Sequence, residues 1–254
     1  LALDAGNTNI TIGVFDETRL VRHWRLRTVH DQTSDEWGIL LRNLFALGDL
    51  NLSRIDGIII ASVVPPLEST LASMSRRYFD REPMFVTADT DTGMRIRYDN
   101  PREVGADRIV NSVAAIHKYG APCVVVDLGT AITFDAISRN HEYLGGLICP
   151  GIGMSVQGLF TRTARLPLVD FRRPPSVIGT NTVNSMQAGL YYGVIGTVDG
   201  ILERLITTLG ADMKTVATGG QAELIVAGSR YIGRADPDLT LEGLQLLWQR
   251  NQRQ

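Results

Sequence analysis

The chain has 254 residues, a formal net charge of −2 and 44% hydrophobic residues, which predicts a soluble α/β protein of one large or two moderate domains. A charge so close to zero gives no general attraction to nucleic acid or to an anionic membrane, and no DNA-binding motif is present. Two cysteines, Cys123 and Cys149, are too few for a disulfide framework or a zinc cluster. We therefore expect reduced thiols, a cytoplasmic location, and no nucleic-acid or membrane partner.

The chain begins at Leu1 inside a predicted strand, so we expect a start methionine and a few residues to precede it. No signal peptide and no apolar run of about 18 residues is found in the sequence.

The first predicted element is an apolar strand that stops at Asp4-Ala5-Gly6 and returns as an alternating strand through Ile10 and Thr11. This pattern is typical of a β-hairpin. Glycine lets backbone N–H groups approach a ligand closely, and a turn with outward amides can bind phosphate. A further alternating strand over residues 20–27 predicts a three-stranded antiparallel meander.

Helices and strands then alternate through the first half of the chain. A helix is predicted from Ser34, where an acidic start precedes apolar residues at helical spacing. Residues 55–64 predict a buried strand that ends at two prolines, residues 67–79 a helix, and residues 84–86 a short strand. The first half thus runs βββ-α-β-α-β, a meander that feeds parallel units.

An Asp-Arg pair opens the next predicted helix, in the sequence Gly105-Ala106-Asp107-Arg108. Aspartate near a helix start is favoured by capping and by the helix dipole. The same pair also suits a polar substrate, because the Asp can accept a proton from a hydroxyl and the Arg can bind a carboxylate. The residues alone leave both interpretations open.

The second half opens with a hairpin that repeats the first one. Asp127 matches Asp4, and Gly129 matches Gly6, with one extra residue after Gly6. A carboxylate at a strand end can hold a metal ion or its waters. Each hairpin alone is explained by a simple turn, but the pair predicts a duplicated domain with two phosphate-binding turns facing each other across a cleft. The domains are expected at 1–117 and 118–254.

The rest of the second half is richer in glycine. Residues 141–148 predict a strand, 154–165 a helix, and 166–181 an irregular segment that is a surface loop, a mobile flap or a subunit contact. Small residues at helical spacing then predict close helix packing, within the chain or between two copies: Ala188, Gly189, Gly193 and Gly196. Thr218-Gly219-Gly220 ends a strand and opens a helix, which suits a phosphate or an adenosine group. Residues 239–248 predict a final helix.

Several common nucleotide-binding signatures are missing from the sequence. It contains no G-x-x-x-x-G-K-[ST] loop, no protein-kinase lysine and catalytic-loop set, and no G-x-G-x-x-G between a strand and a helix. Two Asp-x-Gly hairpins and a distal Thr-Gly-Gly remain. Phosphoryl transfer needs amides around the phosphates, a cation to offset charge and an acceptor held in line, and we expect this chain to supply each of them.

The set of motifs resembles the type III pantothenate kinases, within the superfamily of acetate and sugar kinases, Hsp70 and actin. The matching pieces lie in family order along nearly the whole chain: Asp4–Asn9, Asn100-Pro101, Gly105–Arg108, Asp127–Ala131, Gly145-Gly146, Pro150-Gly151, Gly179–Thr182 and Thr218–Gly220. The family usually has Gly-Lys-Asn-Thr where this chain has Gly179-Thr180-Asn181-Thr182, so no role is carried over to position 180.

The resemblance implies an α/β fold of duplicated actin-like (ribonuclease H-like) domains, each with a mixed five-stranded sheet and flanking helices, and an ATP cleft between them. It implies ATP-dependent phosphorylation of pantothenate to 4′-phosphopantothenate, the first step of coenzyme A biosynthesis. It also implies Mg²⁺, a monovalent cation (K⁺ or NH₄⁺), and a homodimer with pantothenate bound near the subunit interface.

The family's functional residues carry over to matching positions. The ATP-binding residues would be Asp4, Ala5, Gly6, Asn7, Thr8, Asn9, Ile10, Thr11 and Thr130. The pantothenate-binding residues would be Tyr98, Gly105, Ala106, Asp107, Arg108 and Thr182. Asp107 would accept the proton of the substrate hydroxyl, Asp127 would hold the monovalent cation, and Asp4 would lie near Mg²⁺, directly or through water.

Two other function classes stay open at this stage. One is a different small-molecule kinase of the same superfamily, although the chain is short for a sugar kinase with inserted subdomains. The other is a non-catalytic regulator of the Bvg accessory factor type, against which the near-neutral charge and the intact Asp4, Asp107 and Asp127 count.

Overall fold

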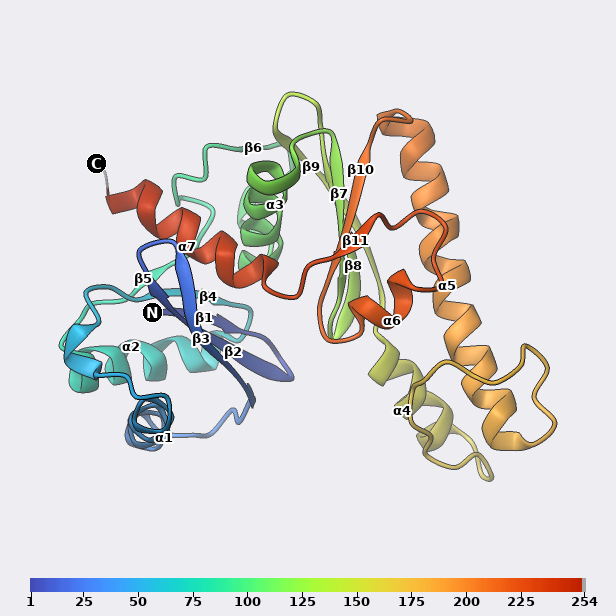
Figure 1. Cartoon of the computed structure of the whole chain (residues 1–254), viewed down its shortest axis with the longest axis horizontal. Coiled ribbons are helices and arrows are strands. Elements are labelled where there is room, and N and C mark those ends of the chain that lie inside the picture. The colour runs from blue at the N-terminus through green and yellow to red at the C-terminus, as the bar shows by residue number, and fades with distance from the viewer. Residues whose placement is uncertain (253–254) are drawn as a thin grey trace. The chain divides into compact units, whose positions relative to one another are not determined.

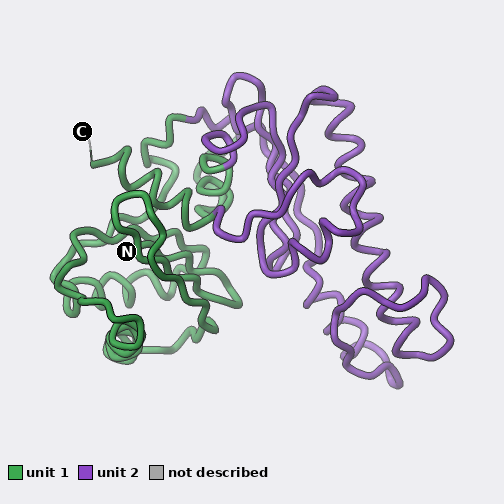
Figure 2. Tube along the Cα trace, in the orientation of Figure 1, with its two compact units in different colours: residues 1–93, 99–114, 240–254 green, residues 94–98, 115–239 purple. Residues whose placement is uncertain are grey.

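A computed structural model describes residues 1–252 and separates into two compact units (Figure 2). Unit 1 contains residues 1–93, residues 99–114 and the described residues from 240 onward. Unit 2 contains residues 94–98 and 115–239. Each unit is thus assembled from separate stretches of chain. The domain limits expected from the sequence, 1–117 and 118–254, stay a prediction.

Unit 1 is built on a five-stranded mixed sheet of order β3-β2-β1-β4-β5 (Figure 1). Its strands are β1 (Ala2–Ala5), β2 (Asn9–Asp16), β3 (Arg19–Arg27), β4 (Ile59–Ser62) and β5 (Met84–Phe85). The first three strands pair antiparallel as the predicted meander, and β4 and β5 continue the sheet in parallel to β1. Its helices are α1 (Ser34–Leu47), α2 (Pro65–Phe79) and α7 (Leu239–Gln252), with short 3₁₀ turns at Leu52–Arg54 and Pro101–Glu103. Helix α3 (Ala106–Tyr119) begins in unit 1 and its last residues, from 115 on, belong to unit 2.

Local sequence signals explain where the helices of unit 1 begin. Helix α1 starts at Ser34 as predicted, because Thr33 and Glu36 form a capping box that satisfies free backbone N–H groups. Helix α2 starts at Pro65, two residues earlier than predicted. The two prolines that were interpreted as the end of a strand occupy the first helical turn, where a missing N–H costs nothing.

Close backbone contact holds α7 in unit 1. A Cβ atom on Gly243 would lie 2.4 Å from the Val110 carbonyl oxygen of α3, so only glycine allows this approach. Gln245 also donates a hydrogen bond to the Glu17 carbonyl oxygen at the turn between β2 and β3.

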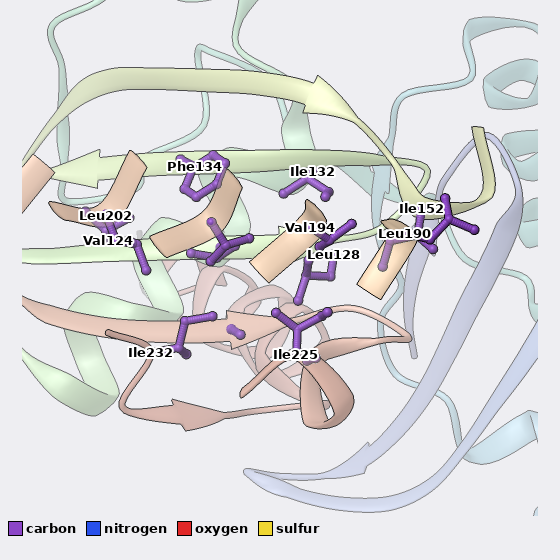
Figure 3. Close-up of a cluster of buried hydrophobic side chains, with 14 of the residues drawn as sticks. Val124, Leu128, Ile132, Phe134, Ile152, Leu190, Val194, Leu202, Ile225 and Ile232 are labelled. Carbon is purple, nitrogen blue, oxygen red and sulfur yellow. The ribbon is translucent and has the colours of Figure 1, made fainter. Parts of the chain in front are cut away.

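Unit 2 is built on a six-stranded sheet of order β11-β10-β7-β8-β9-β6. Its strands are β6 (Arg95–Ile96), β7 (Cys123–Leu128), β8 (Ala131–Ile137), β9 (Glu142–Pro150), β10 (Lys214–Thr218) and β11 (Arg234–Ala235). Its helices are α4 (Ile152–Arg162), α5 (Thr182–Leu209) and α6 (Ala222–Val226). Residues of β7, β8, α4, α5 and α6 gather into one buried apolar cluster (Figure 3).

The two sheets show the duplication predicted from the hairpins. Strands β9-β8-β7-β10-β11 repeat the order and the directions of β3-β2-β1-β4-β5. The expectation of five strands in each sheet needs one correction. Unit 2 has a sixth, β6, which is a two-residue strand with no recognisable sequence pattern and pairs with β9 in parallel.

The remaining expectations for unit 2 concern its helices and the segment before α5. Residues 166–181 contain no helix or strand, as expected, and α4 ends at Arg162, three residues before the predicted end of that helix. On α5, Ala188 is buried, whereas a Cβ atom on Gly189, Gly193 or Gly196 would meet no atom within 4 Å in the described chain. None of the helices within residues 1–252 is both long and apolar enough to cross a membrane.

Candidate functional site

The two Asp-x-Gly turns occupy equivalent places in their sheets. Asp4 lies opposite Thr11 in the antiparallel pair β1–β2, and Asp127 lies opposite Thr133 in β7–β8. The turn of unit 1 closes with a hydrogen bond from Gly6 N–H to the Asn9 carbonyl oxygen at 3.0 Å, and that of unit 2 with one from Gly129 N–H to Ala131 at 3.1 Å. The extra residue in the first turn therefore lengthens the loop without changing the register around the aspartates.

The turn of unit 1 presents Asn7 and Thr8 to solvent, while Ala5 and Ile10 are fully buried. Both buried residues are among those predicted to bind ATP, and neither exposes any surface to solvent. Thr28, which follows β3, holds this loop in place through two hydrogen bonds. Its hydroxyl donates to the Gly6 carbonyl oxygen at 2.6 Å, and its N–H donates to the Thr8 carbonyl oxygen at 2.9 Å. Sequence reasoning missed Thr28 because its role depends on a contact distant in the chain.

The turn of unit 2 lies directly against the start of helix α4. Gly151 is the N-cap of α4, and a Cβ atom on it would lie 1.9 Å from the Thr130 carbonyl oxygen. Only glycine allows the helix to begin there. The free N–H groups of a helix N-terminus attract anions, so this placement is compatible with the phosphate binding predicted for the Gly129-Thr130 turn.

The third glycine turn, after β10, also reaches Asp127. Gly219 has φ +90°, and a Cβ atom on it would lie 2.7 Å from both Asp127 Oδ1 and the Leu128 carbonyl oxygen. Asp127 Oδ1 and the Leu128 carbonyl oxygen thus lie close together beside Gly219, which has no side chain. Oxygen ligands of this kind suit K⁺, which proteins bind through carbonyl groups. The donor set therefore fits the predicted monovalent cation at Asp127.

No group of three or more His, Cys, Asp or Glu side chains arranged to hold a metal is found among residues 1–252. Asp4, partly exposed at the end of β1, is the carboxylate that the resemblance assigns to Mg²⁺. One carboxylate fits that ion when substrate phosphates and water supply the other ligands.

The Gly105–Arg108 motif lies close to the first turn. A Cβ atom on Gly105 would be 3.5 Å from Val63 Cγ1, and the Val63 N–H donates to the Ala5 carbonyl oxygen at 3.0 Å. The structure therefore brings together, within unit 1, the motif expected to bind the acceptor and the turn expected to bind phosphate.

Asp107 is partly buried in the first turn of α3, and its Oδ1 accepts the Arg108 N–H at 2.8 Å. Burial raises the pKa of Asp107, and the Arg108 N–H and guanidinium oppose that rise. The same oxygen lies over Gly105, where a Cβ atom would come within 2.5 Å of it. The carboxylate thus accepts one of the free N–H groups in the first turn of α3, and glycine at position 105 leaves room for it.

The other predicted substrate residues, Tyr98 and Thr182, lie in unit 2. Tyr98 follows β6, with its ring centroid 6.3 Å from that of Tyr143. Thr182 is the exposed first residue of α5 and lines a groove of about 740 Å³. The other residues that line the groove are Leu159, Leu166, Gly179, Thr180, Asn181, Ser185, Met186, Gly189 and Leu190.

The family model of the type III pantothenate kinases matches residues 1–204. The chain belongs to this family. It is 66% identical over 251 residues to a type III pantothenate kinase of Solibacter usitatus, covering 99% of this chain and 96% of that protein. It is 58% identical to one of Koribacter versatilis, with the same two coverages.

Two solved structures share the fold of the family at low sequence identity. One, from Sinorhizobium meliloti, is described as a 2-dehydro-3-deoxygalactonokinase, with a TM-score of 0.61 and 13% identity over 98% of this chain and 95% of that chain. The other, from Campylobacter jejuni, is described as a Baf family transcriptional activator, with a TM-score of 0.60 and 18% identity over 100% of this chain and 99% of that chain. These likenesses confirm the predicted actin-like fold.

Replacing Thr28 in this family member with valine is expected to loosen the first turn. Thr28→Val keeps the size and β-branching but leaves the Gly6 carbonyl oxygen without its donor, which lowers the free energy of unfolding by about 1–3 kcal/mol. We also expect the KM for ATP to rise. Urea denaturation and steady-state kinetics measure the two effects, and Thr28→Ser, which keeps the hydroxyl, serves as the matched control. Equal stability of the valine and serine variants would contradict the assignment.

Proposed function

We propose that the protein transfers the γ-phosphoryl group of ATP to the primary hydroxyl of pantothenate. The observation that carries this proposal is that Gly105, which opens the motif, lies next to Val63, whose N–H is hydrogen-bonded to Ala5 of the first turn. An acceptor-binding motif beside a phosphate-binding turn is the arrangement that positioning catalysis of phosphoryl transfer requires. Membership of the type III family supports pantothenate as the acceptor.

The proposed nucleotide-binding groups are the Asp4–Thr11 turn and Thr130. Backbone N–H groups of the turn would cradle phosphate oxygens, and Asp4 would hold Mg²⁺, directly or through water. Mg²⁺ would supply positive charge that offsets the charge of the transferring phosphoryl group. The start of α4 would add a positive helix end near Thr130.

The proposed acceptor-binding groups are Tyr98, Gly105, Ala106, Asp107, Arg108 and Thr182. Arg108 would bind the pantothenate carboxylate, since a guanidinium forms paired hydrogen bonds with a carboxylate. Asp107 would orient the hydroxyl and take its proton late. The transition state of phosphoryl transfer is loose, so the hydroxyl need not lose its proton before the bond to phosphorus forms. A raised pKa makes Asp107 a better proton acceptor than an ordinary carboxylate.

A homodimer is part of the proposal because the family resemblance implies it. The exposed stripe of Gly189, Gly193 and Gly196 on α5 supports it, since small residues let two helices approach closely. Exposed Met154, Phe160, Val183 and Tyr192 on α4 and α5 add apolar surface. Sedimentation velocity at assay concentrations tests this part of the proposal, and a monomer would contradict it.

The proposed activity is tested by ADP release with Mg-ATP and pantothenate, in K⁺, in NH₄⁺ and in Na⁺. We expect turnover that requires pantothenate and is much faster in K⁺ or NH₄⁺ than in Na⁺, because Asp127 and the Leu128 carbonyl would hold the cation. Equal turnover in the three salts would contradict the monovalent-cation site but would not contradict the kinase activity.

The alternatives considered from the sequence give different results in the same assay. A different kinase of the superfamily would release ADP only with another acceptor. A regulator of the Bvg accessory factor type would release none with any acceptor and would instead show salt-dependent retention on DNA.

A further inference from the structure

Strand β6 is the element that fixes Tyr98 on the sheet of unit 2. It pairs in parallel with β9, with Ile96 opposite Tyr143, and the Arg97 N–H donates to the Tyr143 carbonyl oxygen at 2.8 Å. The Arg97 guanidinium forms an ion pair with Glu142 at 2.7 Å. The residue before Tyr98 is therefore held through both its backbone and its side chain.

The ring of Tyr98 is confined by two neighbours on β9. Its centroid lies 6.3 Å from that of the Tyr143 ring, with 51° between the two planes. On Gly145, which has φ +108°, a Cβ atom would lie 3.3 Å from Tyr98 Cε2. Any other residue at position 145 would be strained and would press on the Tyr98 ring.

Tyr143 is itself fixed by a buried carboxylate. Its hydroxyl donates to Asp135 Oδ1 at 2.8 Å, and both residues have no exposed surface. Asp135 lies on β8 and also accepts the Thr133 hydroxyl at 3.4 Å. A hydrogen bond to a buried carboxylate is strong and directional, so it sets the position of the Tyr143 ring.

We propose that Asp135, Tyr143 and Gly145 are positioning residues for acceptor binding, which act by holding the Tyr98 ring in its binding orientation. This inference rests on the proposed function, in which Tyr98 contacts pantothenate. The alternative is that the Asp135–Tyr143 pair only stabilises the core of unit 2. The alternative predicts that breaking the pair lowers stability alone. The positioning role predicts in addition a higher KM for pantothenate, which requires the Tyr98 ring to be present.

The test is a double-mutant cycle between Tyr143→Phe and Tyr98→Ala. We expect Y143F to raise the KM for pantothenate roughly tenfold, because small displacements of a binding group have large effects. The KM for ATP should change less than about twofold, since Tyr98 and Tyr143 lie outside the nucleotide turns. In the Y98A background Y143F should add nothing further. Tyr231→Phe is the matched control, because the hydroxyl that it removes donates an exposed hydrogen bond to Glu203, far along the chain from Tyr98.

Additive effects in the cycle, or a folded Y143F variant with an unchanged KM for pantothenate, would overturn the inference. Should Y143F fail to fold, Glu142→Gln decides instead, because it weakens the ion pair to Arg97 on a more accessible edge of the sheet. If E142Q raises the KM for pantothenate in the wild-type background but not in the Y98A background, the inference is supported. If E142Q does not raise this KM, the inference is overturned.

A readout without substrate separates this inference from the proposed function. Hydrogen exchange at residues 95–98 should be faster in Y143F and in E142Q, and unchanged in Y231F. Wild-type turnover without dependence on pantothenate would refute the proposed function, whatever the exchange shows. Unchanged exchange in both variants would refute the positioning.

Discussion

Replacing Asp107 with asparagine is expected to remove most of the kinase activity and, at neutral pH, to make the folded protein more stable. Asparagine has nearly the same shape, and its amide oxygen still accepts the Arg108 N–H, so the start of α3 stays intact. The side chain can no longer take a proton from the pantothenate hydroxyl. General-base contributions are typically 10²- to 10⁴-fold, so we expect kcat to fall by roughly 10²-fold or more.

The direction of the stability change follows from the raised pKa of Asp107. Burial disfavours the charged carboxylate, so the folded state binds its proton more tightly than the unfolded state does. The stability contributed by this group is fully present below the unfolded pKa of about 3.9 and is lost as the pH rises through the higher folded pKa. At neutral pH the wild-type protein therefore carries a penalty that asparagine lacks.

The measurement is kcat and the midpoint of thermal unfolding for both proteins at pH 7 and again near pH 4. We expect Asp107→Asn to melt at a higher temperature at pH 7, with a smaller difference near pH 4. Asp49→Asn is the matched control, because Asp49 is exposed and has φ +56°, a conformation that asparagine also tolerates. An Asp107→Asn variant that keeps most of its kcat would disprove the catalytic assignment.

The duplicated hairpins were predictable because their signal is local. A period of two fixes which residues face each other across a hairpin, so the match of Asp4 with Asp127 in the sequence became the same register in both sheets. The apolar runs of β4 and β7 are also local signals, because a continuous apolar run predicts a buried strand. Family motifs in the expected order then identified the fold.

What the sequence did not reveal depends on contacts between distant segments. Strand β6 has only two residues, and it exists because β9 offers an edge for pairing. Thr28 looks like any strand residue, and its role comes from hydrogen bonds to a loop some twenty residues earlier. Pro150-Gly151 matches a family motif, but the reason for glycine is its close approach to the Thr130 carbonyl, which exists only in the folded chain.

Replacing Gly219 with alanine is expected to damage stability and the response to K⁺ together. A non-glycine residue at φ +90° is strained, and the new Cβ atom would lie 2.7 Å from Asp127 Oδ1 and from the Leu128 carbonyl oxygen. Strain and overpacking together should lower the free energy of unfolding by roughly 2–4 kcal/mol. Relief of the overlap must move the carboxylate or the carbonyl, and both are proposed ligands of the cation.

The alanine variant should therefore lose most of the difference between turnover in K⁺ and in Na⁺, and not merely lose activity in proportion to unfolding. Gly158→Ala is the matched control, because Gly158 lies in the middle of α4 and a Cβ atom there meets nothing within 4 Å. In a helix that change should stabilise by about 0.5–1 kcal/mol and leave the cation response intact. A Gly219→Ala protein that stays folded and keeps the wild-type ratio of rates in K⁺ and Na⁺ would show that the cation does not bind where the third glycine turn meets Asp127.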